Sequence, residues 1–138
     1  MRVFIDTCIP MYAAGSEHPC KKSCLDIMES AARGLLEAYT DAEVLEEILY
    51  RYFSINQKQI GLQVFDQFSK IMDGAVLPIR HYDVSLSRSL SEEESYAHLS
   101  PRDLVHLAVM LNNDISCIVT ADQGFARIPS IKVIYPSR

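Results

Sequence analysis

Short apolar runs alternate with longer amphipathic segments along this chain, and that alternation constrains its fold more than any other feature. The runs that predict β-strands are residues 3–5, 37–39, 75–79, 115–120 and 132–135. Apolar residues at helical spacing between them predict helices over residues 18–33, 41–53, 60–72, 83–96 and 101–112. Strands that alternate with helices form right-handed crossovers, so we expect a mostly parallel sheet with helices on both faces.

The length of the chain sets the number of domains. A chain of 138 residues is about the size of one domain and can bury a single sizeable core. We find no internal repeat, low-complexity tract or linker in it. The fold that we expect is therefore one three-layer α/β/α domain over residues 1–138.

Composition narrows the classes of function. The longest apolar runs are four or five residues, far short of the ~20 that a membrane span needs, and we expect no signal peptide and no membrane association. The net charge of −5 argues against a broad basic face for nucleic acid. A protein of this charge that acts on nucleic acid needs cations to do so.

Four cysteines, at positions 8, 20, 24 and 117, are expected to be reduced, as in a cytoplasmic protein. Cys20 and Cys24 are four residues apart and in a helix could share a metal ion. No second pair of ligands accompanies them, which favours small apolar residues of the core instead.

Acidic residues stand where an open α/β sheet holds its ligands, beyond the carboxyl ends of strands. Asp6 directly follows the run Val3-Phe4-Ile5, and Asp122 follows the apolar "CIVTAD" segment. Each has a simpler interpretation as a turn residue, because Asp is common in turns. Taken alone, Asp6 fits a turn at least as well as a catalytic site.

Two predicted helices carry further candidates. Asp103 lies in the first turn of "SPRDLVHLAVML", where Ser100 and Asp103 also match a capping pattern with Pro101 at the first helical position. Glu46 and Glu47 lie in "TDAEVLEEILY", and Glu47 can pair with Arg51 four residues later.

These acids become more informative as a set, because the expected fold can bring the strand ends and the helix start together. Carboxylates that meet at one edge repel one another unless something compensates their charge. Hard divalent cations such as Mg²⁺ and Mn²⁺ prefer oxygen ligands and would do so. The set therefore indicates a candidate metal site.

The order of four segments resembles the PIN-domain family, in particular the VapC-type toxins of prokaryotic toxin–antitoxin pairs. The segments are "FIDTCIPMYAAGSEHP", "TDAEVLEEILYRY", "SPRDLVHLAVMLNND" and "IVTADQGFARIP". The resemblance covers nearly the whole chain. It implies a PIN-like nuclease domain: a ribonuclease that depends on Mg²⁺ or Mn²⁺ held by Asp6, Glu47, Asp103 and Asp122, with RNA as substrate, a small VapB-type antitoxin as partner, and a homodimer.

Two positions depart from the family pattern. Many relatives have Asn or Ser where this chain has Cys8, and a thiol is a poor ligand for Mg²⁺, so we expect Cys8 to support the site only through its backbone. Relatives often carry another Asp where this chain has Ala126. These departures keep open an alternative, a PIN-fold interaction module with weak or no catalytic activity.

Other enzyme classes fit less well. A phosphotransferase of the haloacid-dehalogenase type needs a second Asp two residues after Asp6, where Cys8 stands, and the P-loop motif is absent. No arrangement of Ser, Cys or His suggests a side-chain nucleophile. The metal-dependent hydrolysis of phosphodiesters by water remains the reaction that the resemblance implies.

Neighbouring residues have predicted supporting roles. The helical wheel does not choose between Glu46 and Glu47, whereas the family pattern favours Glu47. Glu43 matches a capping box with Thr40. We expect His106 to be a buried, hydrogen-bonded histidine rather than a general base, and Thr120 either to orient a carboxylate or simply to pack.

Overall fold

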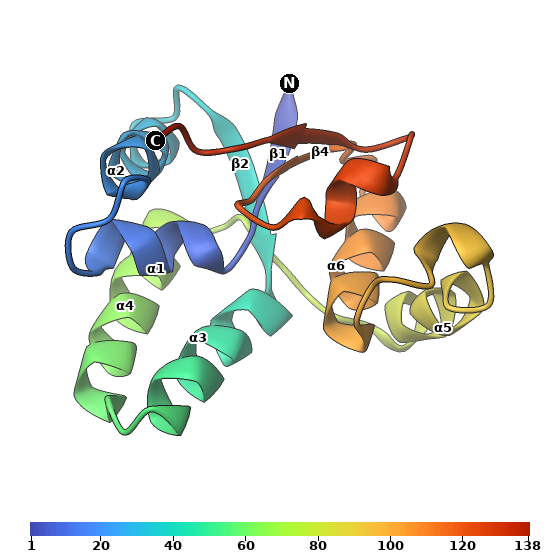
Figure 1. Cartoon of the computed structure of the whole chain (residues 1–138), viewed down its shortest axis with the longest axis horizontal. Coiled ribbons are helices and arrows are strands. Elements are labelled where there is room, and N and C mark those ends of the chain that lie inside the picture. Colours follow the sequence, from blue (N-terminus) through green and yellow to red (C-terminus); the bar gives the residue numbers. More distant parts are fainter.

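The computed structural model describes residues 1–138, and a five-stranded sheet in the order β3-β2-β1-β4-β5 runs through its centre (Figure 1). The strands are β1 (Arg2–Ile5), β2 (Glu37–Asp41), β3 (Val76–Leu77), β4 (Cys117–Val119) and β5 (Lys132–Ile134). All four neighbouring pairs are parallel. The prediction of a mostly parallel sheet is confirmed.

Six α-helices and two short 3₁₀ helices surround the sheet. They are α1 (Cys8–Ala14), α2 (Lys21–Ala32), α3 (Ala42–Ser54), α4 (Lys58–Ile71), α5 (His81–Leu90), α6 (Pro101–Asn112), η1 (Glu94–Tyr96) and η2 (Gln123–Arg127). In Figure 1, α1, α2 and α4 gather on one side of the strands, and α5 and α6 lie on the other. This is the expected three-layer α/β/α arrangement. None of the helices combines the length and the apolar composition that crossing a bilayer requires.

The central strand β1 is apolar because both of its faces are covered. Val3, Phe4 and Ile5 are fully buried, and Phe4 lies opposite Tyr39 of β2 and Ile118 of β4. A parallel strand that is buried on both faces reads as a continuous apolar run rather than an alternating one. The carboxyl end of β1 lies between those of β2 and β4, so the residues that follow β1 stand at this edge of the sheet.

Helix α1 was not predicted from the sequence. It is only seven residues long and has Pro10 in its first turn, where the missing N–H is tolerated. A helix of less than two full turns shows little periodicity. Burial of Pro10 and the packing of Ile9 in the hydrophobic core support it instead.

The helix predicted over residues 83–96 is shorter than expected, because α5 ends at Leu90 and a separate 3₁₀ turn follows. Glu92, Glu93 and Glu94 follow this end of the helix. Negative charges are unfavourable at a helix carboxyl terminus, where the macrodipole is already negative. This run of glutamates therefore explains why α5 ends earlier than predicted.

The first turns of α6 and α3 test two capping predictions. Ser100 caps α6 by accepting a hydrogen bond from the Asp103 N–H at 3.2 Å, with Pro101 at the first position, as predicted. The capping box of Thr40 and Glu43 is wrong. Asp41 caps α3 by accepting a bond from the Val44 N–H at 2.9 Å, and the Thr40 hydroxyl donates to the Ile5 carbonyl at 3.0 Å. Because β2 extends to Asp41, Thr40 lies within the sheet.

Candidate active site

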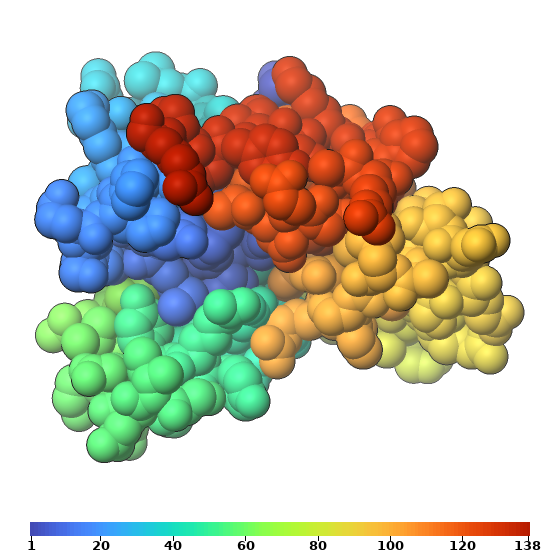
Figure 2. Space-filling model, in the orientation of Figure 1, coloured from blue at the N-terminus to red at the C-terminus, as the bar shows by residue number.

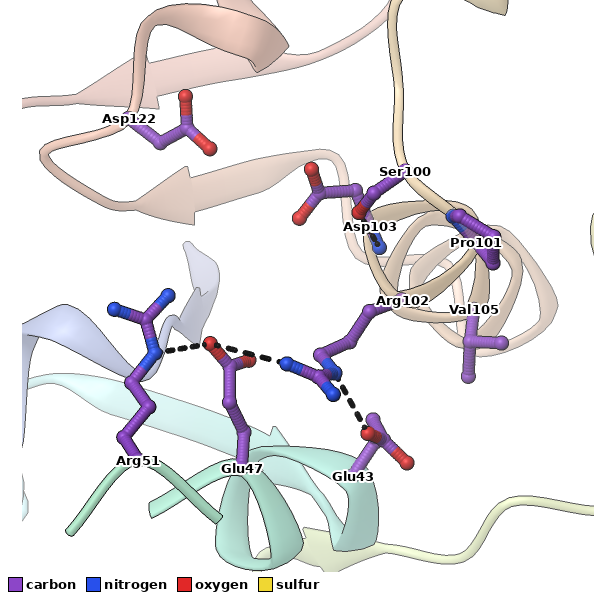
Figure 3. Close-up of a pocket in the computed structure, with 9 residues that line it drawn as sticks. All are labelled: Glu43, Glu47, Arg51, Ser100, Pro101, Arg102, Asp103, Val105 and Asp122. Carbon is purple, nitrogen blue, oxygen red and sulfur yellow. Dashed lines mark hydrogen bonds and ion pairs between the residues drawn. The ribbon is translucent and has the colours of Figure 1, made fainter. Parts of the chain in front are cut away.

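Four acidic residues predicted from the sequence line one hollow of about 270 Å³ beyond the carboxyl ends of β1 and β4. Asp6 follows β1, Glu47 lies on α3, Asp103 lies on the first turn of α6 and Asp122 follows β4. In Figure 3 the carboxylates of Asp103, Asp122 and Glu47 point into the same space. Elements far apart in sequence thus bring together the acids that the sequence singled out.

A larger hollow of about 560 Å³ adjoins this one and shares Glu47, Arg51, Asp103 and Asp122 with it. Arg102 and Glu43 also line it. The space-filling view shows the surface notched between the green atoms of α3 and the orange and gold atoms that include α6 (Figure 2). Asp122, which is exposed, and Asp103, which is half-buried, are accessible from the hollows, whereas Asp6 and Glu47 are buried deeper in the site.

Asp6 is 8% exposed and is held by two hydrogen bonds. The Thr7 N–H donates to one of its oxygens at 2.7 Å, and the Thr120 hydroxyl donates to the other at 2.7 Å. Of the two roles that the sequence left open for Thr120, orienting a carboxylate and packing, this contact supports the first. Both bonds fix the carboxylate of Asp6 at the end of the central strand.

The structure places Glu47 at the hollow and not Glu46. Glu47 is 5% exposed, whereas Glu46 is exposed to solvent and lines neither hollow. Oε1 of Glu47 accepts a hydrogen bond from the Thr7 hydroxyl at 3.0 Å. Oε2 accepts one from Arg51 Nε at 2.8 Å, which confirms the predicted pair (Figure 3).

Arg102 links the two helices that carry Glu47 and Asp103. Its Nε lies 3.1 Å from an oxygen of Glu43, and its Nη1 lies 3.9 Å from Oε2 of Glu47. The guanidinium also lies over the ring of Tyr50, 5.3 Å from the centroid. Two arginines, Arg51 and Arg102, thus stand at the mouth of the acidic hollow.

The surroundings shift the pKa values of two of these acids in opposite directions. Burial works to raise the pKa of Glu47, but the nearby His106 imidazole and the Thr7 hydroxyl outweigh it, with Arg51 adding to them, and lower the pKa to about 2. Burial raises the pKa of Asp103, and the negative charges of Asp6 and Asp122 raise it further. Nearby carboxylates therefore oppose the charged form of Asp103, whereas His106, Thr7 and Arg51 stabilise the charged form of Glu47.

His106 is a fully buried, hydrogen-bonded histidine, as expected, and its partner is Asp41. Its Nδ1 donates to Oδ2 of Asp41 at 2.7 Å, and its Nε2 lies 3.9 Å from Oε1 of Glu47. Burial works to lower the pKa of His106, but Asp41 and Glu47 outweigh it and raise the pKa to about 10. The imidazole therefore lies buried between two carboxylates, which favour its protonated form, and it lines neither hollow.

The side chain of Cys8, and not only its backbone, contacts the site, which corrects the expectation. Its Sγ accepts a hydrogen bond from the Ala121 N–H at 3.3 Å and lies 3.7 Å from the Thr120 hydroxyl.

All four cysteines are free, and Cys20, Cys24 and Cys117 are buried. Cys20 and Cys24 belong to the hydrophobic core, as favoured from the sequence.

The donor set suits a divalent cation by its chemistry. No group of three or more His, Cys, Asp or Glu side chains converges closely enough here to form a metal site. The hollow is nonetheless lined by four carboxylates, and burial together with the charges of Asp6 and Asp122 raises the pKa of Asp103, an unfavourable environment for its charge that a cation would relieve. Carboxylate oxygens are the ligands that Mg²⁺ and Mn²⁺ prefer, so the residues present fit such an ion.

Sequence reasoning missed Thr7 and Asp41 as members of this network. Thr7 contacts both Asp6 and Glu47, and its only signal in the sequence was a hydroxyl residue directly after the first acid. Asp41 stands at the end of β2 as Asp6 stands after β1. The same rule that singled out Asp6 could have found it, had the strand been predicted to its full length.

Residues 3–131 match the PIN domain family. Over 130 residues the chain is 39% identical to the ribonuclease VapC13 of Mycobacterium tuberculosis, covering 94% of this chain and 97% of that protein. It is 26% identical over 124 residues to the ribonuclease VapC23 of the same species, covering 90% of this chain and 95% of that protein.

Solved structures agree in fold. The VapBC2 structure from Rickettsia felis, bound to a promoter DNA fragment, matches with a TM-score of 0.76 at 18% identity, covering 98% of both chains. VapC20 of Mycobacterium tuberculosis, a sarcin–ricin loop cleaving toxin, matches with a TM-score of 0.73 at 12% identity, covering 92% of this chain and 95% of that one. The chain belongs to the PIN-domain family, within its VapC-type group.

Proposed function

We propose that residues 1–138 form one PIN-like nuclease domain and that the protein is a divalent-metal-dependent endoribonuclease, the toxin of a type II toxin–antitoxin pair. The observation that carries the proposal is the meeting of Asp6, Glu47, Asp103 and Asp122 at one hollow from four parts of the chain. Relatives that are named ribonucleases over almost the same length support the choice of RNA as substrate.

In this proposal the four carboxylates hold Mg²⁺ or Mn²⁺. A bound divalent cation supplies positive charge to a phosphodiester and lowers the pKa of a bound water, so that no side-chain nucleophile is needed. Thr7 and Thr120 orient Asp6 for this purpose. Arg51 and Arg102 supply the positive charge that the rim of the hollow has in the absence of an ion.

Titration of the metal tests this proposal without any choice of RNA. Calorimetry should show saturable Mn²⁺ binding to the wild-type protein, and Asp103→Asn should weaken it at least tenfold, because it removes the charge of a carboxylate that lines both hollows. Asp66→Asn is the matched control, since Asp66 lies exposed on α4 away from both hollows. Wild-type protein that binds no Mn²⁺ would contradict the proposal.

The second candidate is an interaction module with the PIN fold and little or no catalytic activity. Three observations favour it: the ion pair that occupies Glu47, the Cys8 side chain beside Asp6, and an alanine, Ala126, on the exposed turn η2 where relatives often have Asp. This candidate predicts no saturable Mn²⁺ binding. Incubation with total RNA and mapping of the cleavage ends would separate it from the first.

We further propose a small VapB-type antitoxin as partner, a homodimer as the assembly and the cytoplasm as the location. Toxin–antitoxin complexes among the structures of the same fold support the first, and four free cysteines are compatible with the last. Light scattering at micromolar concentration should give twice the chain mass, and the product of a neighbouring gene should inhibit cleavage. A monomer without an inhibitory neighbour would contradict both.

A further inference from the structure

A buried pair, Asp41 and His106, lies beneath the acidic hollow without lining it. Both residues are fully buried, and a bond of 2.7 Å joins them. Asp41 ends β2 and His106 lies on α6, 65 residues further along the chain. A buried ion pair of this kind is costly to assemble, so its geometry and its neighbours indicate what it does.

Asp41 ties two helices together with a single carboxylate. Its Oδ1 accepts the Val44 N–H at 2.9 Å and so caps α3, and its Oδ2 accepts the His106 bond. Helix α3 carries Glu47, and helix α6 carries Asp103. The pair therefore sets the position of one acidic helix against the other.

The other side of His106 faces Glu47. Nε2 of His106 is the one buried side-chain nitrogen or oxygen in the molecule without a hydrogen-bond partner, and it lies 3.9 Å from Oε1 of Glu47. An unpaired buried polar atom is expensive, and a movement of about 1 Å brings this pair to hydrogen-bonding distance. Oε1 of Glu47 is therefore the natural hydrogen-bond partner for the unpaired Nε2 of His106.

The two oxygens of Glu47 face different surroundings. Oε1 is turned inward to the Thr7 hydroxyl and His106, whereas Oε2 is turned to Arg51 and Arg102 at the rim of the hollow. Holding Oε1 from within leaves Oε2 as the oxygen that faces the hollow. The orientation of the Glu47 carboxylate thus depends on Thr7 and His106, the two residues that face Oε1.

We propose that His106, backed by Asp41, is a positioning residue that fixes Oε1 of Glu47 and presents Oε2 alone to the hollow. This inference rests on the proposed role of Glu47 in holding a metal ion. His106 does not contact the reacting atoms in this scheme. It acts through Glu47, as outer-sphere partners of metal ligands commonly do.

The test compares His106→Leu with the double variant Asp41→Asn/His106→Leu. In the single variant, Asp41 is left as an unpaired buried carboxylate, so both the melting temperature and the Mn²⁺ affinity should fall. In the double variant, the amide side chain at position 41 still caps α3 but carries no charge, so the melting temperature should recover. The Mn²⁺ affinity, measured by calorimetry without RNA, should stay at least tenfold below wild type in both.

Met110→Ala is the control for a merely structural effect. Met110 is fully buried on α6, one turn beyond His106, and lines neither hollow. The change should lower the melting temperature but leave the Mn²⁺ affinity within about twofold of wild type. If His106→Leu fails to fold, the double variant alone decides the question.

The outcomes separate this inference from the proposed function. Mn²⁺ affinity that recovers in the double variant along with stability, or that is unchanged in His106→Leu, overturns the inference alone. Wild-type protein that binds no Mn²⁺ overturns the proposed function and this inference with it. Affinity that stays low in a double variant with restored stability supports the positioning role.

Discussion

At the scale of single residues, the acids of the hollow differ in how firmly they are held. Asp6 is fixed by two hydrogen bonds at 2.7 Å, and Glu47 is held from both sides by Thr7 and Arg51. Oδ1 of Asp122 accepts a hydrogen bond from the Gly124 N–H at 2.9 Å. Asp122 therefore both stabilises a turn and lines the hollow. Asp103 is instead opposed by its neighbours. The four side chains are therefore not equivalent, and their substitution should not be equivalent either.

The adjacent glutamates of α3 give the sharpest prediction about single residues. Glu47→Gln should lower metal-dependent RNA cleavage at least about tenfold, a loss of ~1.4 kcal/mol of transition-state stabilisation. Glu46→Gln should stay near wild type, because Glu46 is exposed and lines neither hollow. Initial rates of cleavage measure both, and circular dichroism checks that both variants are folded. A larger loss from Glu46→Gln would move the site to that residue.

The cysteines should be unreactive in the folded protein. Burial raises the pKa of Cys8 to about 11, with the charge of Asp6 adding to it, and burial raises the pKa of Cys24 to about 12. The thiolate is the reactive form, so a disulfide reagent at pH 8 should modify at most one of the four thiols, slowly, before unfolding. All four should react in denaturant. Rapid reaction of several thiols in the native protein would contradict the buried placement.

At the scale of elements, α3 and α4 form a hairpin whose close contact depends on one glycine. Gly61 of α4 lies against Tyr52 of α3, and a Cβ added there would stand 2.6 Å from Tyr52 Cβ. That atom is near the backbone and cannot swing away as the end of a flexible side chain can. The position of α3, and hence of Glu47, therefore depends on a residue that makes no contact with the hollow.

Gly61→Ala should lower the free energy of unfolding by about 1–3 kcal/mol, as overpacked core positions do. The loss is expected even though Ala is better than Gly by about 1 kcal/mol in a helix interior. Urea denaturation measures the effect. Gln63→Ala, at an exposed position of the same helix, is the control and should change stability by no more than ~0.5 kcal/mol. Equal stability of the two variants would contradict the close contact.

At the scale of the whole molecule, net charge is the property that would most affect binding of the proposed RNA substrate. The protein has a net charge of −5, and four of its acids line the hollow where a phosphodiester would have to lie. Two arginines at the rim are themselves paired with glutamates. The negative charge of the protein would therefore repel a phosphate backbone unless divalent cations reverse the sign of the local charge.

RNA cleavage should accordingly be abolished by EDTA and restored by an excess of Mg²⁺ or Mn²⁺. The measurement is the rate of cleavage of total RNA by purified protein, resolved on a gel. The Asp103→Asn variant, treated in parallel, identifies cleavage by a contaminant, because it should be inactive under all these conditions. Cleavage by the wild-type protein that continues in EDTA would contradict metal dependence.

The sequence by itself determined the order of the elements and the acidic character of the site. The alternation of apolar runs with helical patterns predicted the parallel sheet, and the Ser100 cap with Pro101 predicted where α6 begins. These signals are local, because strand burial, helix periodicity and capping depend on residues a few positions apart. Asp6, Asp103 and Asp122 followed from the same local logic, each at the end of a strand or the start of a helix.

Tertiary structure alone decided which side chains meet. A helical wheel could not choose between Glu46 and Glu47, because the choice depends on how α3 lies against β1 and α6. The bond between Asp41 and His106 spans 65 residues, and the bond between Asp6 and Thr120 spans 114. No local pattern encodes such contacts, since they arise only when packed helices and strands bring distant residues to hydrogen-bonding distance.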